Sequence, residues 1–362
     1  MNWNNFIILN NQQIPAQEIS KVHAQKLADP TVADWEKDIY IFLNEWFSNS
    51  DFVMAQTSGS TGYPKSIELP KSLMLKSAER TIDYFGLKAD DQILLSLSCK
   101  FIAGKMMVVR AIAGQMNLIT SDPSGNFDFL QHESFDFGAM VPIQIIKILE
   151  KPVGIANLQN ILNLLVGASA ISVTMEEQIA QLSNRVVSTY GMTETASHIA
   201  IRELSGTRKS EFYHCLSGIS VSLNQNDCLQ IHFPELTEPL QTNDLAKLQS
   251  NTTFQILGRA DSVIISGGIK YSPEAIEKKL EGFIGNRFII SSARDEKLGE
   301  KLVLIIEGKP SPTESIQERM KAMLPAFEQP RMILFVNQFP VTNSGKIIRG
   351  EVKRAIREER TF

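Results

Sequence analysis

The chain has 362 residues and a net charge of −4, and apolar residues make up 43% of it and charged residues 21%. This composition is typical of compact folded proteins and excludes disordered, collagen-like and coiled-coil chains. The slightly acidic balance gives no broad basic field, so no nucleic-acid partner is expected. Three cysteines without a C-x-x-C spacing favour neither a disulfide framework nor a zinc site and predict a cytoplasmic location. Without a signal-peptide pattern or an apolar run near the roughly 20 residues that span a bilayer, neither secretion nor membrane insertion is expected.

Length and charge distribution predict two domains. At roughly 100 to 200 residues per domain, the chain corresponds to about two. Residues 1–261 hold 19 basic and 27 acidic residues, a net charge of −8, whereas residues 262–362 carry a net charge of +4. We therefore expect a large N-terminal domain over residues 1–258 and a small C-terminal domain over residues 259–362.

Strand and helix patterns alternate along both parts. In the first part, the pattern predicts strands and helices in the order 52–54, 73–85, 92–98, 105–113 and 116–120. This alternation predicts a layered α/β sheet. In the second part, a βαββαβα order predicts a small α+β domain. Its first helix is expected to start at Ser272 and Pro273, a hydroxyl N-cap followed by proline.

The loop after the first predicted strand is rich in hydroxyls and glycine. Residues 57–65 read T-S-G-S-T-G-Y-P-K, and they can offer backbone N–H groups, hydroxyls and an ammonium to a polyphosphate. The spacing differs from the Walker pattern, which disfavours an ordinary P-loop kinase or GTPase. A solvated turn has a similar composition, so the loop alone leaves both interpretations open. The candidate phosphate ligands are Thr57, Ser58, Gly59, Ser60, Thr61, Gly62 and Lys65.

Three further clusters follow. Residues 188–195 read S-T-Y-G-M-T-E-T after a short apolar strand, and they combine a purine-stacking ring, a glycine, hydroxyls and a carboxylate that can hold Mg²⁺. Taken alone, this cluster is typical of a turn with a helix cap at Thr193. The others are G-R-A-D at 258–261 and P-V-T-N-S-G-K at 340–346. The joint occurrence and order of the four clusters favour one nucleotide site.

These motifs resemble the adenylate-forming superfamily of acyl- and aryl-CoA synthetases, nonribosomal peptide synthetase adenylation domains and luciferase. V-G-A-S at 166–169 and I-S-G-G at 265–268 add to the match, which covers residues 52 to 354. The resemblance implies an α/β fold with a large N-terminal domain and a small, mobile α+β C-terminal domain. Because the phosphate loop begins early, it also implies a shortened N-terminal part.

The resemblance also implies the roles of individual residues. Lys346, Thr193 and Glu194 are the expected catalytic residues, Glu194 is also the expected Mg²⁺ ligand, and Asp261 is the expected hinge. Asp244, in T-N-D where the family has T-G-D, is carried over as a ribose ligand. The residues expected to bind ATP and coenzyme A, besides the phosphate loop, are Gly167, Ala168, Ser169, Ser188, Tyr190, Gly191, Met192, Asp244, Arg259, Gly267 and Gly268. ATP, Mg²⁺, coenzyme A and a small carboxylic acid are implied, and assembly into a homo-oligomer is left open.

The segment T-E-T-x-S-x-I at 193–199 resembles the o-succinylbenzoate–CoA ligases of menaquinone biosynthesis. That resemblance implies an acyl-adenylate followed by an acyl-CoA thioester. The expected acid-pocket residues are Lys100, Phe101, Gly104, Ser197 and His198. Ser197 is expected to donate a hydrogen bond to the second carboxylate, assisted by Lys100 or a water, with Phe101 beside the ring. His198 by itself is more typical of a surface or satisfied core histidine.

Other functions share these motifs. Another small acyl- or aryl-CoA ligase, or an amino-acid adenylating enzyme, differs only in its acid pocket. A non-catalytic nucleotide-binding regulator and a phosphotransferase are alternatives from different classes. The retention of Glu194, Asp244 and Lys346 disfavours the regulator, and release of pyrophosphate would exclude the phosphotransferase.

Overall fold

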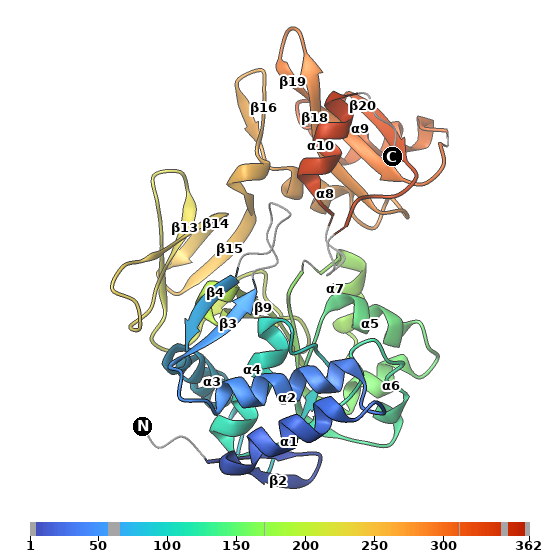
Figure 1. The fold of residues 1–362 in the computed structure, drawn as a ribbon. Helices are drawn as coiled ribbons and strands as arrows, with labels where there is room; N and C mark the ends of the chain where they lie inside the picture. Colours follow the sequence, from blue (N-terminus) through green and yellow to red (C-terminus); the bar gives the residue numbers. More distant parts are fainter. Residues whose placement is uncertain (1–4, 57–65, 170, 311, 342–346, 359–362) are drawn as a thin grey trace. The chain divides into compact units, whose positions relative to one another are not determined.

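The computed structural model describes residues 5–56, 66–169, 171–310, 312–341 and 347–358, and the chain forms two compact units (Figure 1). The first unit holds most of the chain up to Ile219, and the second holds the chain from Ser220. The domain boundary predicted at residue 258 lies within the second unit and stays a prediction. No helix in the described part of the chain is both long and apolar enough to cross a membrane.

The first unit is an α/β structure with one large sheet and a separate hairpin. Its strands are β1 (Phe6–Leu9), β2 (Gln12–Pro15), β3 (Phe52–Gln56), β4 (Ser66–Pro70), β5 (Gln92–Leu95), β6 (Asn117–Thr120), β7 (Phe135–Met140), β8 (Ile161–Val166), β9 (Arg185–Gly191), β10 (His198–Glu203) and β11 (Tyr213–Cys215). Its helices are α1 (Ala16–Ala28), α2 (Asp34–Trp46), α3 (Lys71–Phe85), α4 (Ile102–Gly114), α5 (Pro142–Leu149), α6 (Gly154–Gln159) and α7 (Val173–Ile179), with short 3₁₀ turns at Asp128–Gln131 and Thr193–Thr195.

The large sheet reverses its strand order at β5. In this unit the order is β11-β10-β9-β8-β7-β5-β6-β1-β2, and the strands from β9 to β1 pair in parallel. The chain moves from β5 to β6 through α4, and then from β7 to β9 on the other side through α5, α6 and α7. Right-handed crossovers in opposite directions place their helices on opposite faces of a sheet. Ligands of such folds bind beyond the carboxyl ends of the strands near the reversal.

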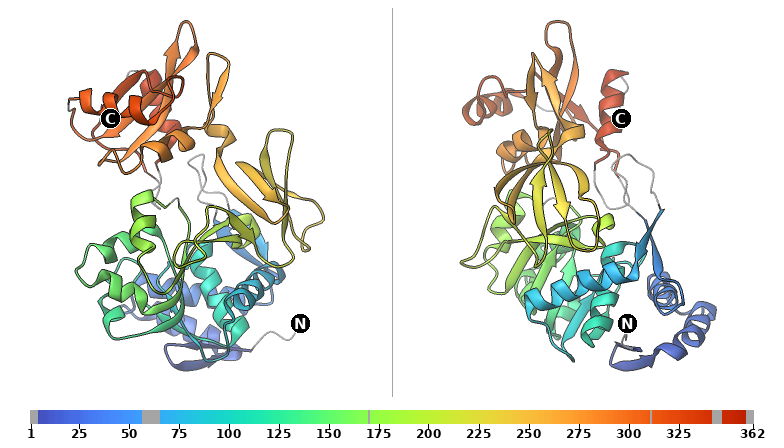
Figure 2. Two further views of the ribbon diagram at one scale, coloured as in Figure 1. Left: turned by 180° about the vertical axis from the view of Figure 1, so that it is seen from behind. Right: turned by 90° about the vertical axis from the view of Figure 1, so that its left-hand side faces the viewer.

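The parallel strands are apolar because both of their faces are covered. Ile93, Leu94 and Leu95 of β5 are each at most 1% exposed. Covered parallel strands contain such continuous apolar runs rather than alternating ones. One core cluster joins β7, β8 and β9 to α5, α6 and α7, and α4 packs against α2 and α3 (Figure 2). The large α/β sheet confirms the predicted fold class.

The second unit contains the antiparallel end of the large sheet and a second, five-stranded sheet. β12 (Ser220–Leu223), β13 (Cys228–His232), β14 (Leu240–Ser250) and β15 (Thr253–Arg259) form an antiparallel meander. A 3₁₀ turn at Ala260–Ser262 follows it. The second sheet contains β16 (Ile264–Ser266), β17 (Ile269–Tyr271), β18 (Phe288–Asp295), β19 (Gly299–Glu307) and β20 (Met332–Val336), and its helices are α8 (Pro273–Leu280), α9 (Glu314–Met323) and α10 (Arg349–Arg357).

Alternating side chains of β19 build two cores in the second unit. Leu302 and Leu304 belong to a cluster with α8 and α9, whereas Val303 and Ile305 belong to a cluster with α10. Successive strand residues point to opposite faces, so a strand covered on both sides must be apolar throughout. The βαββαβα order is confirmed, with β17 added to it. The predicted cap is also confirmed, because Ser272 Oγ accepts a hydrogen bond from Ala275 N at 3.3 Å.

Candidate active site

The predicted purine and magnesium motif lies at the carboxyl end of β9. A methyl group on Gly191 would lie 2.3 Å from the Ser197 carbonyl oxygen, so only glycine lets β10 fold back this closely. Thr195 fixes the turn, because its hydroxyl accepts from Met192 N at 3.0 Å and lies 2.6 Å from the Ser197 carbonyl oxygen. The chain therefore holds Glu194 outside the sheet, exposed to solvent, and sends Ser197 back along the sheet.

Nucleotide-side residues of two neighbouring strands meet at this edge. Val166, the last residue of β8, pairs with Ser188 of β9, so the segment 167–169 follows directly beside the purine motif. The ring of Tyr190 lies 5.9 Å from the ring of Tyr213, and Ser188 Oγ is 3.1 Å from the Tyr213 hydroxyl. The ends of β8 and β9 therefore lie side by side, and the candidate nucleotide residues on and after these strands are Gly167, Ala168, Ser169, Ser188, Tyr190, Gly191 and Met192. Tyr213 was not predicted, because it lies far from the motif in sequence.

A buried polar cluster lies on the other side of Ser197. Arg110 of α4 is 2% exposed, and its Nη2 donates to Ser197 Oγ at 2.7 Å. His198 is 6% exposed; its Nδ1 lies 3.2 Å from Ser197 Oγ and its Nε2 lies 3.3 Å from Thr81 Oγ1. Because the Thr81 hydroxyl donates to the Ser77 carbonyl at 3.1 Å, it accepts from His198 Nε2–H. His198 Nδ1 is then the acceptor, and the ring is neutral.

Arg110 has no carboxylate partner among the described residues. Its other contacts are Met107 Sδ at 3.7 Å and His198 Nδ1 at 3.5 Å, and its Nε has no partner there. Burial lowers the pKa of Arg110 to about 9, so the guanidinium is still charged at neutral pH. Burial, and then the charge of Arg110, lower the pKa of His198 well below its usual range. A buried cation without a counter-ion is costly, because no opposite charge compensates for its lost hydration.

Sequence reasoning missed Arg110 and Thr81. Arg110 is the one charged residue within the apolar run M-M-V-V-R-A-I at 106–112 of a helix buried on all sides, and this was the available signal. Thr81 carried no such signal, because its contact with His198 spans 117 residues of sequence. His198 has partners at both ring nitrogens, which matches the expectation of a satisfied core histidine.

The remaining acid-pocket candidates lie at the start of α4. A methyl group on Gly104 would lie 2.3 Å from the Ser98 carbonyl oxygen, so glycine allows α4 to begin against the end of β5. Phe101 is the N-cap and is 42% exposed. Lys100 is exposed and its Nζ lies 3.6 Å from Asp38. The cation that contacts Ser197 is therefore Arg110, whereas the ion pair of Lys100 is with Asp38.

The ribose-side and hinge residues form a cluster of charges in the second unit. Arg259 Nη1 donates to Asp244 at 3.1 Å, while its Nε and Nη2 donate to Asp261 at 3.0 and 2.9 Å. Arg259 therefore links the expected ribose ligand to the expected hinge residue. Gly267 and Gly268 form the turn between β16 and β17.

Some predicted residues lie outside the described part of the chain. These are Thr57, Ser58, Gly59, Ser60, Thr61, Gly62 and Lys65 of the phosphate loop, and Lys346. Among the described residues, no group of three or more His, Cys, Asp or Glu side chains could hold a metal ion. Glu194 alone fits a magnesium ion that takes most of its oxygen ligands from phosphates and water.

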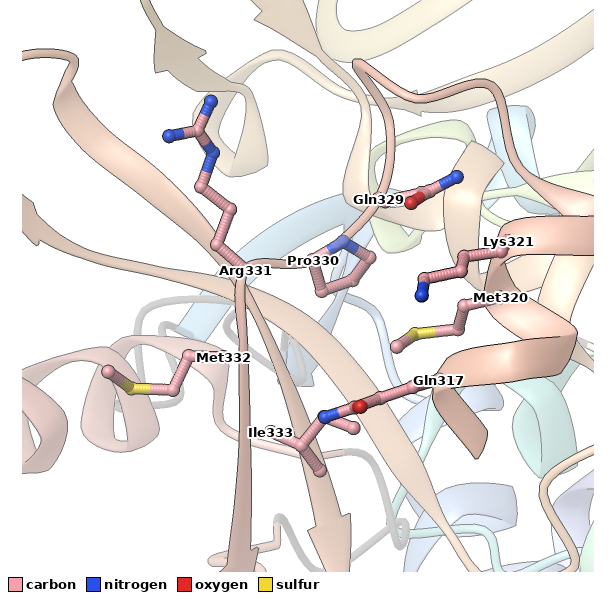
Figure 3. A pocket seen from close by; sticks show the side chains of 8 residues that line it. All are labelled: Gln317, Met320, Lys321, Gln329, Pro330, Arg331, Met332 and Ile333. Atoms are coloured by element: carbon pink, nitrogen blue, oxygen red, sulfur yellow. The ribbon is translucent and has the colours of Figure 1, made fainter. Parts of the chain in front are cut away.

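The described residues of each unit line a hollow at the surface. One, of about 380 Å³, is lined by residues of α2, β3 and β4 and by Cys99, Lys100 and Lys105. The other, of about 210 Å³, lies in the second unit between α9 and β20 (Figure 3). Figure 3 shows the Arg331 side chain turned away from Lys321, so these two cations do not converge on one ligand. None of the predicted site residues lines this second hollow.

The sheet reversal and the turn after β9 are features of a doubly wound α/β fold with a candidate nucleotide site at its edge. The model of the family described as "AMP-binding enzyme" matches residues 9–221, more than half of the chain, so the chain belongs to this family. The predicted superfamily is therefore confirmed, and the chain is an adenylate-forming acid–CoA ligase.

Particular relatives are similar over nearly the whole chain. The chain is 22% identical to the 2-succinylbenzoate–CoA ligase of Lactococcus lactis, over 94% of this chain and 81% of that protein. It is 32% identical, with a TM-score of 0.61, to an acyl-CoA synthetase-like protein of Dyadobacter fermentans, over 91% of this chain and 97% of that one. The fold also matches the o-succinylbenzoate CoA synthetase of Bacillus subtilis with a TM-score of 0.76 at 17% identity, over 97% and 95% of the two chains. Other relatives are named for indoleacetate and ferulate.

Proposed function

We propose that the chain converts o-succinylbenzoate, ATP and coenzyme A to o-succinylbenzoyl-CoA, AMP and pyrophosphate in menaquinone biosynthesis in the cytoplasm. The superfamily chemistry needs a carboxylic acid, and the open question is which acid. Relatives named for this substrate support the proposal, but relatives named for other aryl acids occur at similar identity. The choice among these acids therefore depends on the residues of the acid pocket in this chain.

The observation that carries the proposal is the unpaired charge of Arg110. o-Succinylbenzoate has an aromatic ring and two carboxylates, and only one of them is activated. The second carboxylate must meet a cation inside the pocket, because an unpaired buried charge is costly. Arg110 is a buried cation that contacts Ser197 at 2.7 Å and has no carboxylate partner among the described residues. A dicarboxylic acid supplies the missing anion, whereas a simple monoacid does not.

In this proposal the adenylation step depends on positioning and charge compensation. A carboxylate is a poor nucleophile that triphosphate repels, so the two must be held together while positive charge accumulates around the phosphates. Lys346 and Lys65 supply that positive charge, while Thr193 and Glu194, at the carboxyl end of β9, bind the phosphates and the magnesium ion. Tyr190 packs on the adenine, and Asp244 and Arg259 hold the ribose. Magnesium held by Glu194 neutralises phosphate charge when it is bound.

The second step of the proposal replaces AMP by the thiol of coenzyme A. The small C-terminal domain, residues 259–362, rotates about Asp261, which withdraws Lys346 and brings Gly267 and Gly268 beside the thiol's path. The ion pairs from Arg259 to Asp244 and to Asp261 support this assignment, since one side chain connects the ribose ligand to the hinge.

The experiment that tests the proposal is a pyrophosphate-release assay over a panel of acids, with and without coenzyme A. The panel contains o-succinylbenzoate, benzoate, indoleacetate, ferulate, fatty acids and amino acids. We expect the highest kcat/KM with o-succinylbenzoate and a thioester product when coenzyme A is present. Better activation of a fatty acid, an aryl monoacid or an amino acid would replace the substrate but leave the ligase class intact. Formation of ADP without pyrophosphate would point to the phosphotransferase, and no turnover would point to the regulator.

A further inference from the structure

The strand that leads into the predicted phosphate loop has its outer edge satisfied by side chains. β3 and β4 form a sheet of only two strands, with Gln56 paired to Ser66 at its end. On the edge of β3 away from β4, Ser50 Oγ accepts from Phe52 N at 3.1 Å and donates to Phe52 O at 3.0 Å. A two-stranded hairpin is marginally stable by itself, so it depends on contacts of this kind.

Two charged side chains hold the next free backbone groups on that edge. Glu45 of α2 accepts a hydrogen bond from Met54 N at 2.6 Å. Lys105 of α4 donates to Met54 O at 2.5 Å, and its Nζ lies 3.4 Å from Glu45. We call Glu45 and Lys105 together the Met54 clamp. The clamp satisfies one N–H and one C=O of the same residue, as a neighbouring strand would.

The burial of Lys105 shows that the clamp is a built feature of the fold. Lys105 is 8% exposed, and its Nζ lies 5.2 Å from the centre of the Phe42 ring. Lysine is rarely buried unless it is paired. Lys105 also directly follows Gly104, whose close approach to Ser98 fixes the start of α4. The clamp therefore ties β3 to the two helices α2 and α4.

We infer that the Met54 clamp is a positioning device for the phosphate loop, so that Glu45 and Lys105 set the affinity for the polyphosphate of ATP without touching it. β3 ends at Gln56, and the candidate phosphate ligands begin at the next residue. Because the chain passes directly from β3 into this loop, the position of β3 relative to α2 and α4 sets where the loop begins. The inference rests on the proposed function for the role of the loop.

The test compares the binding of ATP and AMP, because only ATP carries the polyphosphate. The variants are Lys105→Met and Glu45→Gln. Lys26→Met is the matched control: Lys26 also pairs with an acid of α2, Glu36 at 3.1 Å, and lies 5.2 Å over an aromatic ring, that of Tyr40. The dissociation constants of ATP and AMP are measured by competition with a fluorescent ATP analogue, and the melting temperature is measured in parallel.

We expect Lys105→Met to weaken ATP binding by up to about tenfold, because the clamp loses one hydrogen bond from a charged group and that bond's energy is the most it can pass on to the loop. AMP binding should stay within about twofold. Glu45→Gln keeps an acceptor for Met54 N and should weaken ATP less. Lys26→Met should bind both nucleotides as the wild type does. An equal loss of ATP and AMP affinity, or no loss of either, overturns the inference. If Lys105→Met does not fold, the ratio of the ATP and AMP dissociation constants in Glu45→Gln tests the inference instead.

The nucleotide comparison does not depend on the acid. A wild-type protein that binds ATP but activates no acid contradicts the proposed function, while the variant ratios still decide the role of the clamp. A wild-type protein that binds neither nucleotide overturns both the proposed function and the inferred role of the Met54 clamp.

Discussion

Arg110 in the first unit is buried and Arg349 in the second is partly buried, and among the described residues only Arg349 has a carboxylate counter-ion. Arg349 donates to both oxygens of Glu277, at 2.8 and 2.5 Å, and its Nε lies 3.8 Å from Glu274. Burial alone would lower the pKa of Arg349, but its bonds to Glu277 outweigh this and raise the pKa. Burial lowers the pKa of Arg110, which contacts a hydroxyl, an imidazole and a thioether.

The difference separates a structural arginine from one that suits a ligand. A buried ion pair is held together because each charge satisfies the other, and removal of one partner exposes the full cost of the remaining charge. Arg349 has this arrangement within the folded chain. Arg110 lacks it, so the fold keeps a desolvated cation whose cost a bound anion can offset. The two sites should therefore respond in opposite ways to loss of the arginine.

The largest expected effect is on catalysis by Arg110→Met. We expect kcat/KM for o-succinylbenzoate to fall by roughly 100-fold or more, since the second carboxylate would lose its buried partner. Stability in the absence of substrate should be unchanged or higher, because an unpaired buried charge is replaced by an apolar side chain. Steady-state kinetics and urea unfolding measure the two quantities. A large loss of stability with unchanged kinetics would make Arg110 a structural arginine like Arg349.

The next effect is on the stability of the second unit. Arg349→Met leaves Glu277 without its bidentate partner, and we expect a loss of about 2 kcal/mol, below the value for a fully buried pair because part of the side chain is exposed. Arg349→Lys should recover only part of this loss, since lysine cannot bind both carboxylate oxygens. Urea unfolding measures the change. Equal stability of the Met variant and the wild type would remove the contrast between the two arginines.

A smaller effect is expected at Ser197, which links Arg110 to the acid pocket. Ser197→Ala removes one charge-assisted hydrogen bond, so KM for o-succinylbenzoate should rise about tenfold, while kcat/KM for benzoate-like monoacids should change little. The rise should be much smaller in the Arg110→Met background, because the two side chains act on the same carboxylate. Additive effects in the double variant would show that Ser197 acts independently.

The sequence predicted the parts of the molecule that depend on local patterns. The helix start at Ser272 and the apolar strand β19 follow from capping chemistry and from burial on two faces, which neighbouring residues express directly. The motif at Tyr190 to Glu194 was found because a turn after a strand needs its glycine and hydroxyls in one short segment. Arg110 was missed because a helical pattern shows which residues share one face of the helix but not which residues of the fold that face contacts. Its contact with Ser197 spans 87 residues of sequence, and only the packing of α4 against β10 creates it.

The smallest expected effect is on the pH dependence of folding stability, which arises from the neutral His198 beside Arg110. Its pKa is lowered by burial and then by Arg110, so the folded protein binds a proton at His198 less readily than the unfolded chain does. Below the unfolded pKa near 6.5, the unfolded chain takes up the proton first, and stability falls as pH falls, by at most about 1.4 kcal/mol per pH unit. His198→Gln should lower stability at pH 7 yet give a shallower decline between pH 6.5 and 5 than the wild type. Urea unfolding at several pH values measures both slopes, and parallel declines would mean that His198 does not stay neutral in the fold.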